Sequence, residues 1–195
     1  MKLSGSVKYQ KTYLYTIYLS PKDHEEELIR IFGNRWNKGK RCFNAGEENY
    51  KSEISNIIPG TIYIVVHEKN TQDYGSASVD VRDLCFKDDA QAWLWGLCRH
   101  GIKTSDISPI KVLFDVIGQY ILQTFKKKYI YLSPEPGEGI EKLKSIYTKY
   151  GFVEAYCPIY NQYAMRKKIS LNKKLVSFSK TRSRRPRGRT RSKQM

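Results

Sequence analysis

Residues 126–152, KKKYIYLSPEPGEGIEKLKSIYTKYGF, contain the pattern that decides the fold. The aromatic and β-branched run at 129–132 predicts a buried central strand. After a Pro/Gly turn, we expect Gly151 to end a helix in a left-handed conformation and Phe152 to turn back toward the core. The apolar residues of this helix recur at spacings of three and four, which predicts a single packing face: Ile140, Leu143, Ile146, Tyr147 and Tyr150.

The end of this predicted helix, IYTKYGF at 146–152, resembles the LYxKxGF element that closes the acyl-CoA fold of the GNAT (GCN5-related) N-acetyltransferases. The resemblance implies that Tyr147 is the catalytic acid that protonates the departing thiolate of coenzyme A. The plainer alternative is that Tyr147 is an amphipathic core residue. The family usually also carries an asparagine about two turns before this tyrosine, where this chain has Ile140.

The N-terminal part predicts a strand followed by a helix. The strand covers residues 9–19 and is stopped by Ser20 and Pro21. Asp23 is expected to cap the helix, since Asp is a preferred N-cap residue. Glutamates at 25–27 place negative charge in the first turn, where the helix dipole favours it. Gly33 is expected to end the helix. Residues 48–57 fit a short second helix.

Three further strands are predicted in the middle of the chain. Residues 61–67 and 76–86 should form a hairpin, because an apolar run and an alternating run flank a polar turn. Residues 90–98 form the next strand, in which Gly96 indicates a bulge or a close approach by a ligand.

The connection at 99–107 leads from that strand into a helix with Ser108 as N-cap and Pro109 as first residue. Such a junction directs unpaired N–H groups and a positive dipole end at one point, which suits a pyrophosphate. The loop resembles the GNAT coenzyme A loop, Q/R-x-x-G-x-G/A, although the later glycines are replaced; an ordinary solvated loop is the alternative. The coenzyme-binding residues implied by the resemblance are Leu97, Cys98, Arg99, Gly101, Lys103, Thr104 and Ser105.

A closing hairpin at 153–160 and 162–169 completes the expected order. The predicted fold class is α/β (α+β), with a single GNAT-like domain at 1–169. Its central sheet is expected to be mixed, mostly antiparallel and flanked by helices. Residues 170–195 are predicted to be a disordered basic tail, because they contain too few apolar residues to fold alone.

No catalytic base stands out in the sequence. Glu68, Asp80, Asp83 and His67 are candidates by location only. A Cys98/His100 nucleophile pair is discounted because no carboxylate is evident to orient the histidine. Wide spacing of the four cysteines predicts neither a metal site nor a disulfide framework, so four reduced thiols are expected: Cys42, Cys85, Cys98 and Cys157.

Positive charge is concentrated at the C-terminus. Of the net charge of +16, thirteen positive charges follow Glu154 and no acidic residue does, so residues 1–154 carry only +3. We expect the tail to bind DNA or RNA without sequence preference. A nuclear-import signal, an anionic-membrane contact and a solubilising tail are the alternatives. The expected nucleic-acid contacts are Lys180, Arg182, Arg184, Arg185, Arg187, Arg189, Arg191 and Lys193.

The resemblance implies an N-acetyltransferase that transfers acetyl from acetyl-CoA to a primary amine by direct attack. The alternative is a catalytically inactive GNAT-like scaffold that binds nucleic acid through its tail. No apolar run reaches the length of a membrane span, and the first ten residues lack the apolar core of a signal peptide. An intracellular location, cytoplasmic or nuclear, is therefore expected rather than secretion.

Overall fold

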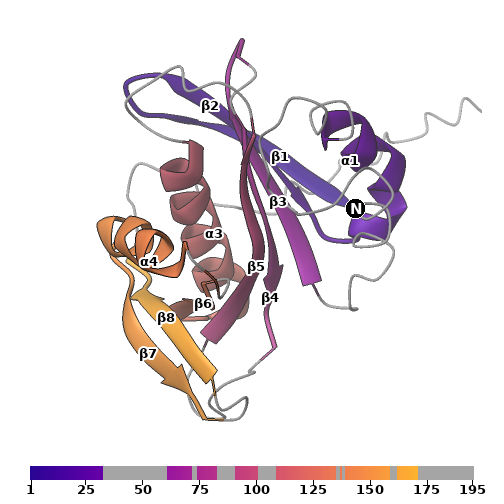
Figure 1. Ribbon diagram of the computed structural model, residues 1–195. Helices are drawn as coiled ribbons and strands as arrows, with labels where there is room; N and C mark the ends of the chain where they lie inside the picture. Colours follow the sequence, from indigo (N-terminus) through magenta and orange to yellow (C-terminus); the bar gives the residue numbers. More distant parts are fainter. Residues whose placement is uncertain are drawn as a thin grey trace, which may run out of the picture.

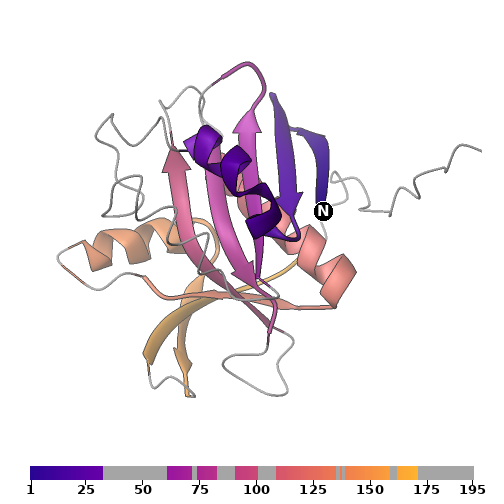
Figure 2. The ribbon, with the colours of Figure 1, turned by 90° about the vertical axis from the view of Figure 1, so that its right-hand side faces the viewer.

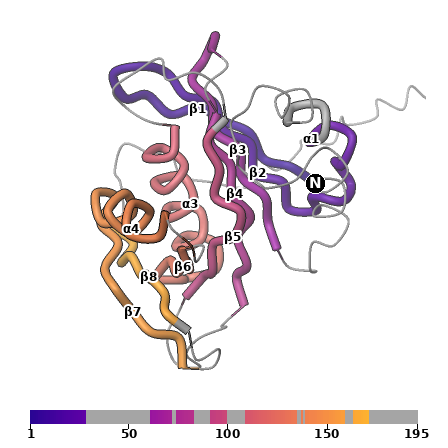
Figure 3. Tube along the Cα trace, in the orientation of Figure 1, coloured from indigo at the N-terminus to yellow at the C-terminus, as the bar shows by residue number. Residues whose placement is uncertain are grey.

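One sheet organises the domain, with strand order β1-β2-β3-β4-β5-β6-β8-β7 (Figures 1 and 3). The computed structural model describes residues 1–32, 61–71, 74–82, 91–100, 109–134, 137, 139–158 and 162–170. The strands are β1 (Lys2–Lys8), β2 (Thr12–Tyr18), β3 (Thr61–Glu68), β4 (Tyr74–Asp80), β5 (Gln91–His100), β6 (Tyr129–Leu132), β7 (Val153–Cys157) and β8 (Gln162–Lys168). The helices are η1 (Pro21–His24), α1 (Glu25–Phe32), α3 (Pro109–Phe125) and α4 (Ile140–Lys149).

The sheet is mixed and mostly antiparallel, as predicted. Within the described part of the chain, β5 and β6 form the one parallel pair, and every other neighbouring pair is antiparallel. A parallel pair requires a crossover connection, and α3 lies in that connection. β8 lies between β6 and β7, an order that the sequence pattern did not indicate.

Helix α3 forms the core on one face of the sheet, and α1 lies on the opposite face (Figure 2). The apolar residues of α3 are broadly distributed around the helix, and Val112, Leu113, Val116, Ile117 and Ile121 are fully buried. They pack with inward-facing residues of β3, β4 and β5. β3 is covered on both faces, which explains its nearly continuous apolar sequence, TIYIVVHE.

The N-terminal part of the chain departs from the predictions at three points. β1 was not predicted, because its mostly polar residues give no apolar signal beyond the buried Val7. The predicted strand at 9–19 is shorter and starts at Thr12. Asp23 lies inside η1, where its own N–H donates to the Ser20 carbonyl at 3.1 Å, so the prediction that it caps the helix is wrong. Gly33 and the helix predicted at 48–57 lie outside the described residues.

The expected boundaries of the two middle strands also change. β4 runs from Tyr74 to Asp80, so the strand predicted at 76–86 begins earlier and stops earlier. β5 continues two residues beyond the predicted end, to His100. Both residues pair with β4, His100 with Tyr74 and Arg99 with Gly75, and this ladder accounts for the extension.

Cys98 and Cys157 are buried and disulfide-bonded in the structure. The expectation of four reduced thiols is therefore wrong for these two residues. Sequence spacing could not reveal this, because disulfide formation depends on distances between Cβ atoms in the folded chain. Disulfides are uncommon in reducing compartments, and the intracellular location stays a prediction.

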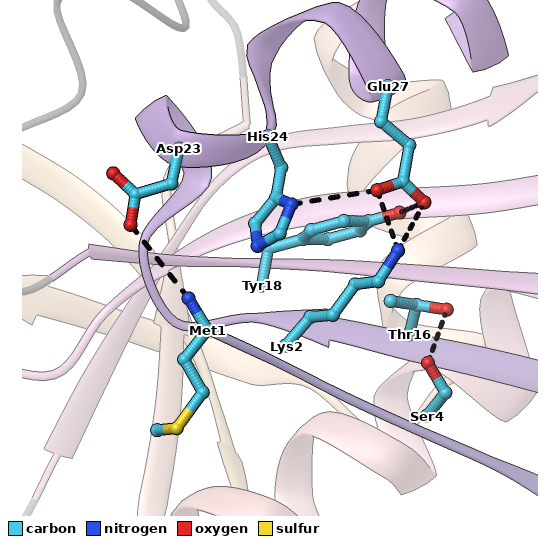
Figure 4. Close-up of polar contacts among 8 residues, drawn as sticks. All are labelled: Met1, Lys2, Ser4, Thr16, Tyr18, Asp23, His24 and Glu27. Atoms are coloured by element: carbon cyan, nitrogen blue, oxygen red, sulfur yellow. Dashed lines mark hydrogen bonds and ion pairs between the residues drawn. The ribbon is translucent and has the colours of Figure 1, made fainter.

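A polar cluster attaches α1 to the first hairpin (Figure 4). The Lys2 ammonium donates to both carboxylate oxygens of Glu27 at 2.7 Å, and the Tyr18 hydroxyl donates to the same carboxylate at 3.3 Å. His24 Nδ1 lies 3.6 Å from Glu27, and the amino group of Met1 lies 3.8 Å from Asp23. The hydrogen bond from Lys2 is the main cause that holds the pKa of Glu27 below its usual range.

This arrangement predicts a pH-dependent contribution to stability. Because the folded pKa of Glu27 is lowered, its contribution is fully present above the ordinary glutamate pKa of about 4.3 and is lost as pH falls through the folded value. Both side chains are partly exposed, so the contribution should be at most about 1 kcal/mol. Urea unfolding at pH 6 and pH 3 should show a smaller loss of stability for Glu27→Gln than for wild type. Equal losses would contradict the assignment, and the exposed Glu26→Gln variant is the control.

Candidate active site

β5 and β6 separate after a short stretch of pairing. Their ladder contains three pairs, Gln91 with Tyr129, Ala92 with Ile130, and Trp93 with Tyr131. β6 then ends at Leu132, whereas β5 continues to His100 alongside β4 (Figure 1). The side of β5 that faces β6 is therefore outside the described sheet ladder from residue 94 onward. An extended ligand can pair with strand backbone of this kind.

A β-bulge lies in the half of β5 that extends beyond its pairing with β6 and pairs with β4 alone in the described ladder. Ser78 pairs with Trp95 and Ser76 pairs with Cys98, so Gly96 and Leu97 together oppose the single residue Ala77. Gly96 has a φ of 53°, a left-handed conformation that glycine adopts without strain. The structure confirms the predicted bulge.

The N-terminus of α3 lies against the same part of the sheet. A Cβ atom on Gly75 of β4 would come within 3.2 Å of the Pro109 carbonyl carbon and 3.3 Å of the Ile110 nitrogen. Glycine therefore permits the close approach of this helix end to β4. Pro109 is the first residue of α3, as predicted. The sequence interpretation missed Gly75, although a glycine inside an alternating strand is a signal of close backbone contact.

Arg99 is brought to this helix end by its pairing with Gly75. Paired residues of adjacent strands project from the same face, so Arg99 belongs to the α3 face of the sheet. Its guanidinium charge and the positive end of the helix dipole both favour an anion here. Leu97 is half-buried and packs on the core that contains α3. Cys98 is buried and its sulfur is in a disulfide, whereas Gly101, Lys103, Thr104 and Ser105 lie outside the described residues.

Tyr147 lies in the last turn of α4 and is fixed by the end of that helix. The Phe152 N–H donates to the Tyr147 carbonyl at 3.1 Å, and the Gly151 N–H donates to the Thr148 carbonyl at 2.9 Å. With Gly151 at a φ of 85°, these two bonds form a Schellman motif. The Tyr147 ring meets the ring of the fully buried Phe152 edge-on at 5.9 Å. The predicted helix end is confirmed, and Tyr147 is half-buried rather than part of the inner core.

Comparison with known proteins identifies the fold. No protein-family model matches the chain, and no curated protein matches its sequence. Among solved structures, the ribosomal L7/L12 α-N-protein acetyltransferase RimL is similar with a TM-score of 0.52, at 8% identity over 85% of this chain and 94% of that one. Its complex with coenzyme A is similar with a TM-score of 0.50, at 7% identity over 86% and 100% of the two chains. The chain has the GNAT N-acetyltransferase fold.

An uncharacterized protein from Bacillus halodurans is also similar, with a TM-score of 0.51 and 14% identity over 80% of this chain and 84% of that one. All three similarities cover most of both chains. The GNAT resemblance expected from the end of α4 thus extends over the domain. At these identities the similarity concerns the fold and not the residues of the site.

The described base candidates of this GNAT domain already have partners. Glu68 is 4% exposed, and its carboxylate accepts a bond from Lys11 at 2.7 Å. Asp80 is 2% exposed and accepts bonds from the side chain of Arg82. The ring of His67 stacks on Tyr74 with centroids 4.6 Å apart. Asp83 lies outside the described residues, and no base is assigned.

The described residues do not bring together three His, Cys, Asp or Glu side chains that could hold a metal ion. No helix in the described ranges has the length and apolar character needed to cross a membrane.

The close contact at Gly75 predicts a stability effect. Gly75→Val should destabilise the GNAT domain by about 1–3 kcal/mol, because the new side chain meets helix backbone that cannot move without shifting α3. Denaturant unfolding measures the change. Ser6→Val places the same side chain at an exposed position of β1 and should be nearly neutral. Equal stability of the two variants would show that α3 does not approach β4 as closely as described.

Proposed function

We propose that the protein is an acetyl-CoA-dependent N-acetyltransferase that acts on a primary amine. The observation that carries the proposal is the separation of β5 from β6 after three residue pairs, with a bulge at Gly96, beside the N-terminus of α3. Bound acetyl-CoA would supply a thioester that is activated toward amines. The GNAT fold and its similarity to a coenzyme A complex support this ligand.

The proposed coenzyme site divides into two parts. Arg99 and the first N–H groups of α3 would stabilise the pyrophosphate by charge and hydrogen bonding. The backbone of β5 around Gly96 and Leu97, outside the β6 ladder, would hold the extended arm that carries the thioester. Cys98 would contribute through its backbone, since its sulfur is already in a disulfide. Gly101, Lys103, Thr104 and Ser105 complete the proposed set.

In the proposed reaction, the neutral amine nitrogen attacks the thioester carbonyl, and the carbon–sulfur bond breaks as the amide forms. The departing sulfur needs a proton, which Tyr147 would donate from its hydroxyl. The Schellman motif and the contact with Phe152 support this role, because they fix the tyrosine at the helix end. Proton transfer by a fixed side chain typically contributes about 10²–10⁴-fold in rate.

The first test is coenzyme binding by isothermal titration calorimetry. Wild-type protein should bind acetyl-CoA, and Arg99→Gln should bind it about tenfold more weakly or worse, because a charged hydrogen bond is worth about 1.5–3 kcal/mol. Lys22→Gln removes an exposed positive charge elsewhere and should bind like wild type. Absence of heat at millimolar acetyl-CoA, together with no thermal shift, would exclude the enzyme proposal.

The second test concerns Tyr147. Tyr147→Phe should lower turnover by about 10²–10⁴-fold while coenzyme affinity stays close to wild type. Tyr150→Phe is the matched control, because Tyr150 is another half-buried tyrosine at the end of α4, packed on Phe114 at 5.3 Å. Unchanged unfolding midpoints would show that both variants are folded. A wild-type rate for Tyr147→Phe would make Tyr147 a packing residue only.

The second candidate function is a GNAT-shaped scaffold that binds nucleic acid without catalysis. The charge of residues 170–195, ten basic and no acidic residues, favours it. The expected nucleic-acid-binding residues, Lys180 to Lys193, lie outside the described residues, the last of which is Ser170. The acetyl-CoA titration separates this candidate from the enzyme.

A further inference from the structure

Two chain segments rich in basic residues come together where β6 begins and β8 ends. Three consecutive lysines connect α3 to β6, and the chain crosses beside them at the end of β8. Tyr129 pairs with Lys168, and the Ile169 N–H donates to the Lys128 carbonyl at 2.8 Å. We call the following residues the basic patch: Lys126, Lys127, Lys128, Arg166 and Lys168.

The basic patch presents its charge to solvent. Its members are exposed apart from the half-buried Lys127. The Arg166 guanidinium lies 5.7 Å from the centre of the Tyr129 ring, which holds its planar group beside an aromatic surface. The two segments that form the patch, 126–134 and 162–170, contain no Asp or Glu.

One cluster of acidic residues lies away from the basic patch, whereas the exposed Glu154 lies on β7, beside β8. Asp23 and the glutamates at 25–27 lie in η1 and α1, far from β6 and β8 in the views of Figures 1 and 2. Lys2 and Lys11 form their ion pairs with Glu27 and Glu68, at positions away from the patch. The basic patch and this acidic cluster are separate charged regions, and such a separation helps to orient a protein in the field of a polyanion.

The tail follows the basic patch in the sequence. Ser170, the last described residue of the chain, directly follows the β8 segment of the patch. Residues 171–195 carry ten basic and no acidic residues, and six of the ten are arginines. Patch and tail are therefore adjacent in the sequence, and a ligand bound by one is held at high local concentration near the other.

We propose that the basic patch is a docking surface for the phosphate backbone of nucleic acid. Arg166 and Lys168 are two residues apart on β8, so their side chains project from the same face about 6.6 Å apart, a spacing that lets both contact phosphates of one strand. Arginine also matches phosphate by bidentate hydrogen bonding. An anionic membrane is a weaker fit, because surface insertion needs a larger apolar face than the exposed Phe125 and Val153 beside the patch provide.

The proposal is tested in the full chain with a triple variant, Lys128→Gln, Arg166→Gln and Lys168→Gln. The control triple, Lys8→Gln, Lys22→Gln and Lys69→Gln, removes the same charge from exposed positions elsewhere. Binding to a 20-base-pair duplex is measured by fluorescence anisotropy across a salt series. Each lost phosphate contact lowers the slope of log K against log salt by about 0.9, so the patch variant should lose about 2–3. The control should keep the wild-type slope.

Equal slopes for the two variants would overturn the proposal, because binding would then follow net charge or the tail alone. A patch variant that loses binding to phosphatidylserine vesicles but keeps the duplex slope would also overturn it. Lysine labelling of wild-type protein gives a readout that needs no variant. Duplex should protect Lys128 and Lys168 but not Lys8 and Lys22, and uniform labelling of all four would contradict the proposal.

Discussion

The three-residue parallel pairing of β5 with β6 is the constraint on which the structure depends. The buried helix α3 crosses between these strands and fixes β6 beside the start of β5 only. β8 pairs with the edge of β6 that faces away from β5. The strands β6, β8 and β7 therefore continue the sheet from residues 91–93 of β5 and not from residues 94–100. The bulge at Gly96 lies beyond the last β6 pair, and bulges generally increase the local twist of a strand. The candidate site therefore arises where the sheet ladder stops.

Aromatic packing connects the two helices that border this site. Phe114 of α3 lies 5.3 Å from Tyr150 and 5.1 Å from Phe152, ring centre to ring centre. The Lys167 ammonium lies over both phenylalanine rings, at 5.5 and 5.9 Å, and burial lowers its pKa. α4 has no fully buried residue, so contacts at its C-terminal end position it. After the glycine stop, Phe152 contacts both Phe114 of α3 and Tyr147 of α4.

The parts of the fold that could be predicted are those with a strong local pattern. The pattern of apolar residues predicted β3, α3 and α4. The conformational freedom of glycine predicted the bulge at Gly96 and the helix end at Gly151. β1 could not be predicted, because its stability comes from pairing with β2 and not from its own apolar residues. The position of β8, the contact at Gly75 and the disulfides of Cys98 and Cys157 depend on residues distant in the chain.

Helix α3 also determines how the two proposed anion sites are separated. Its N-terminus lies at the candidate coenzyme site, and its C-terminus leads directly into Lys126 of the basic patch. Lys126 adopts a left-handed φ of 60° and donates to the Gln123 carbonyl at 3.0 Å, so its charge partly compensates the negative helix end. The outward charges of the patch are then mainly those of Lys128, Arg166 and Lys168. At 1.5 Å per residue, the 17 residues of α3 separate the two sites by about 25 Å. A coenzyme and a nucleic acid could therefore occupy this domain at the same time.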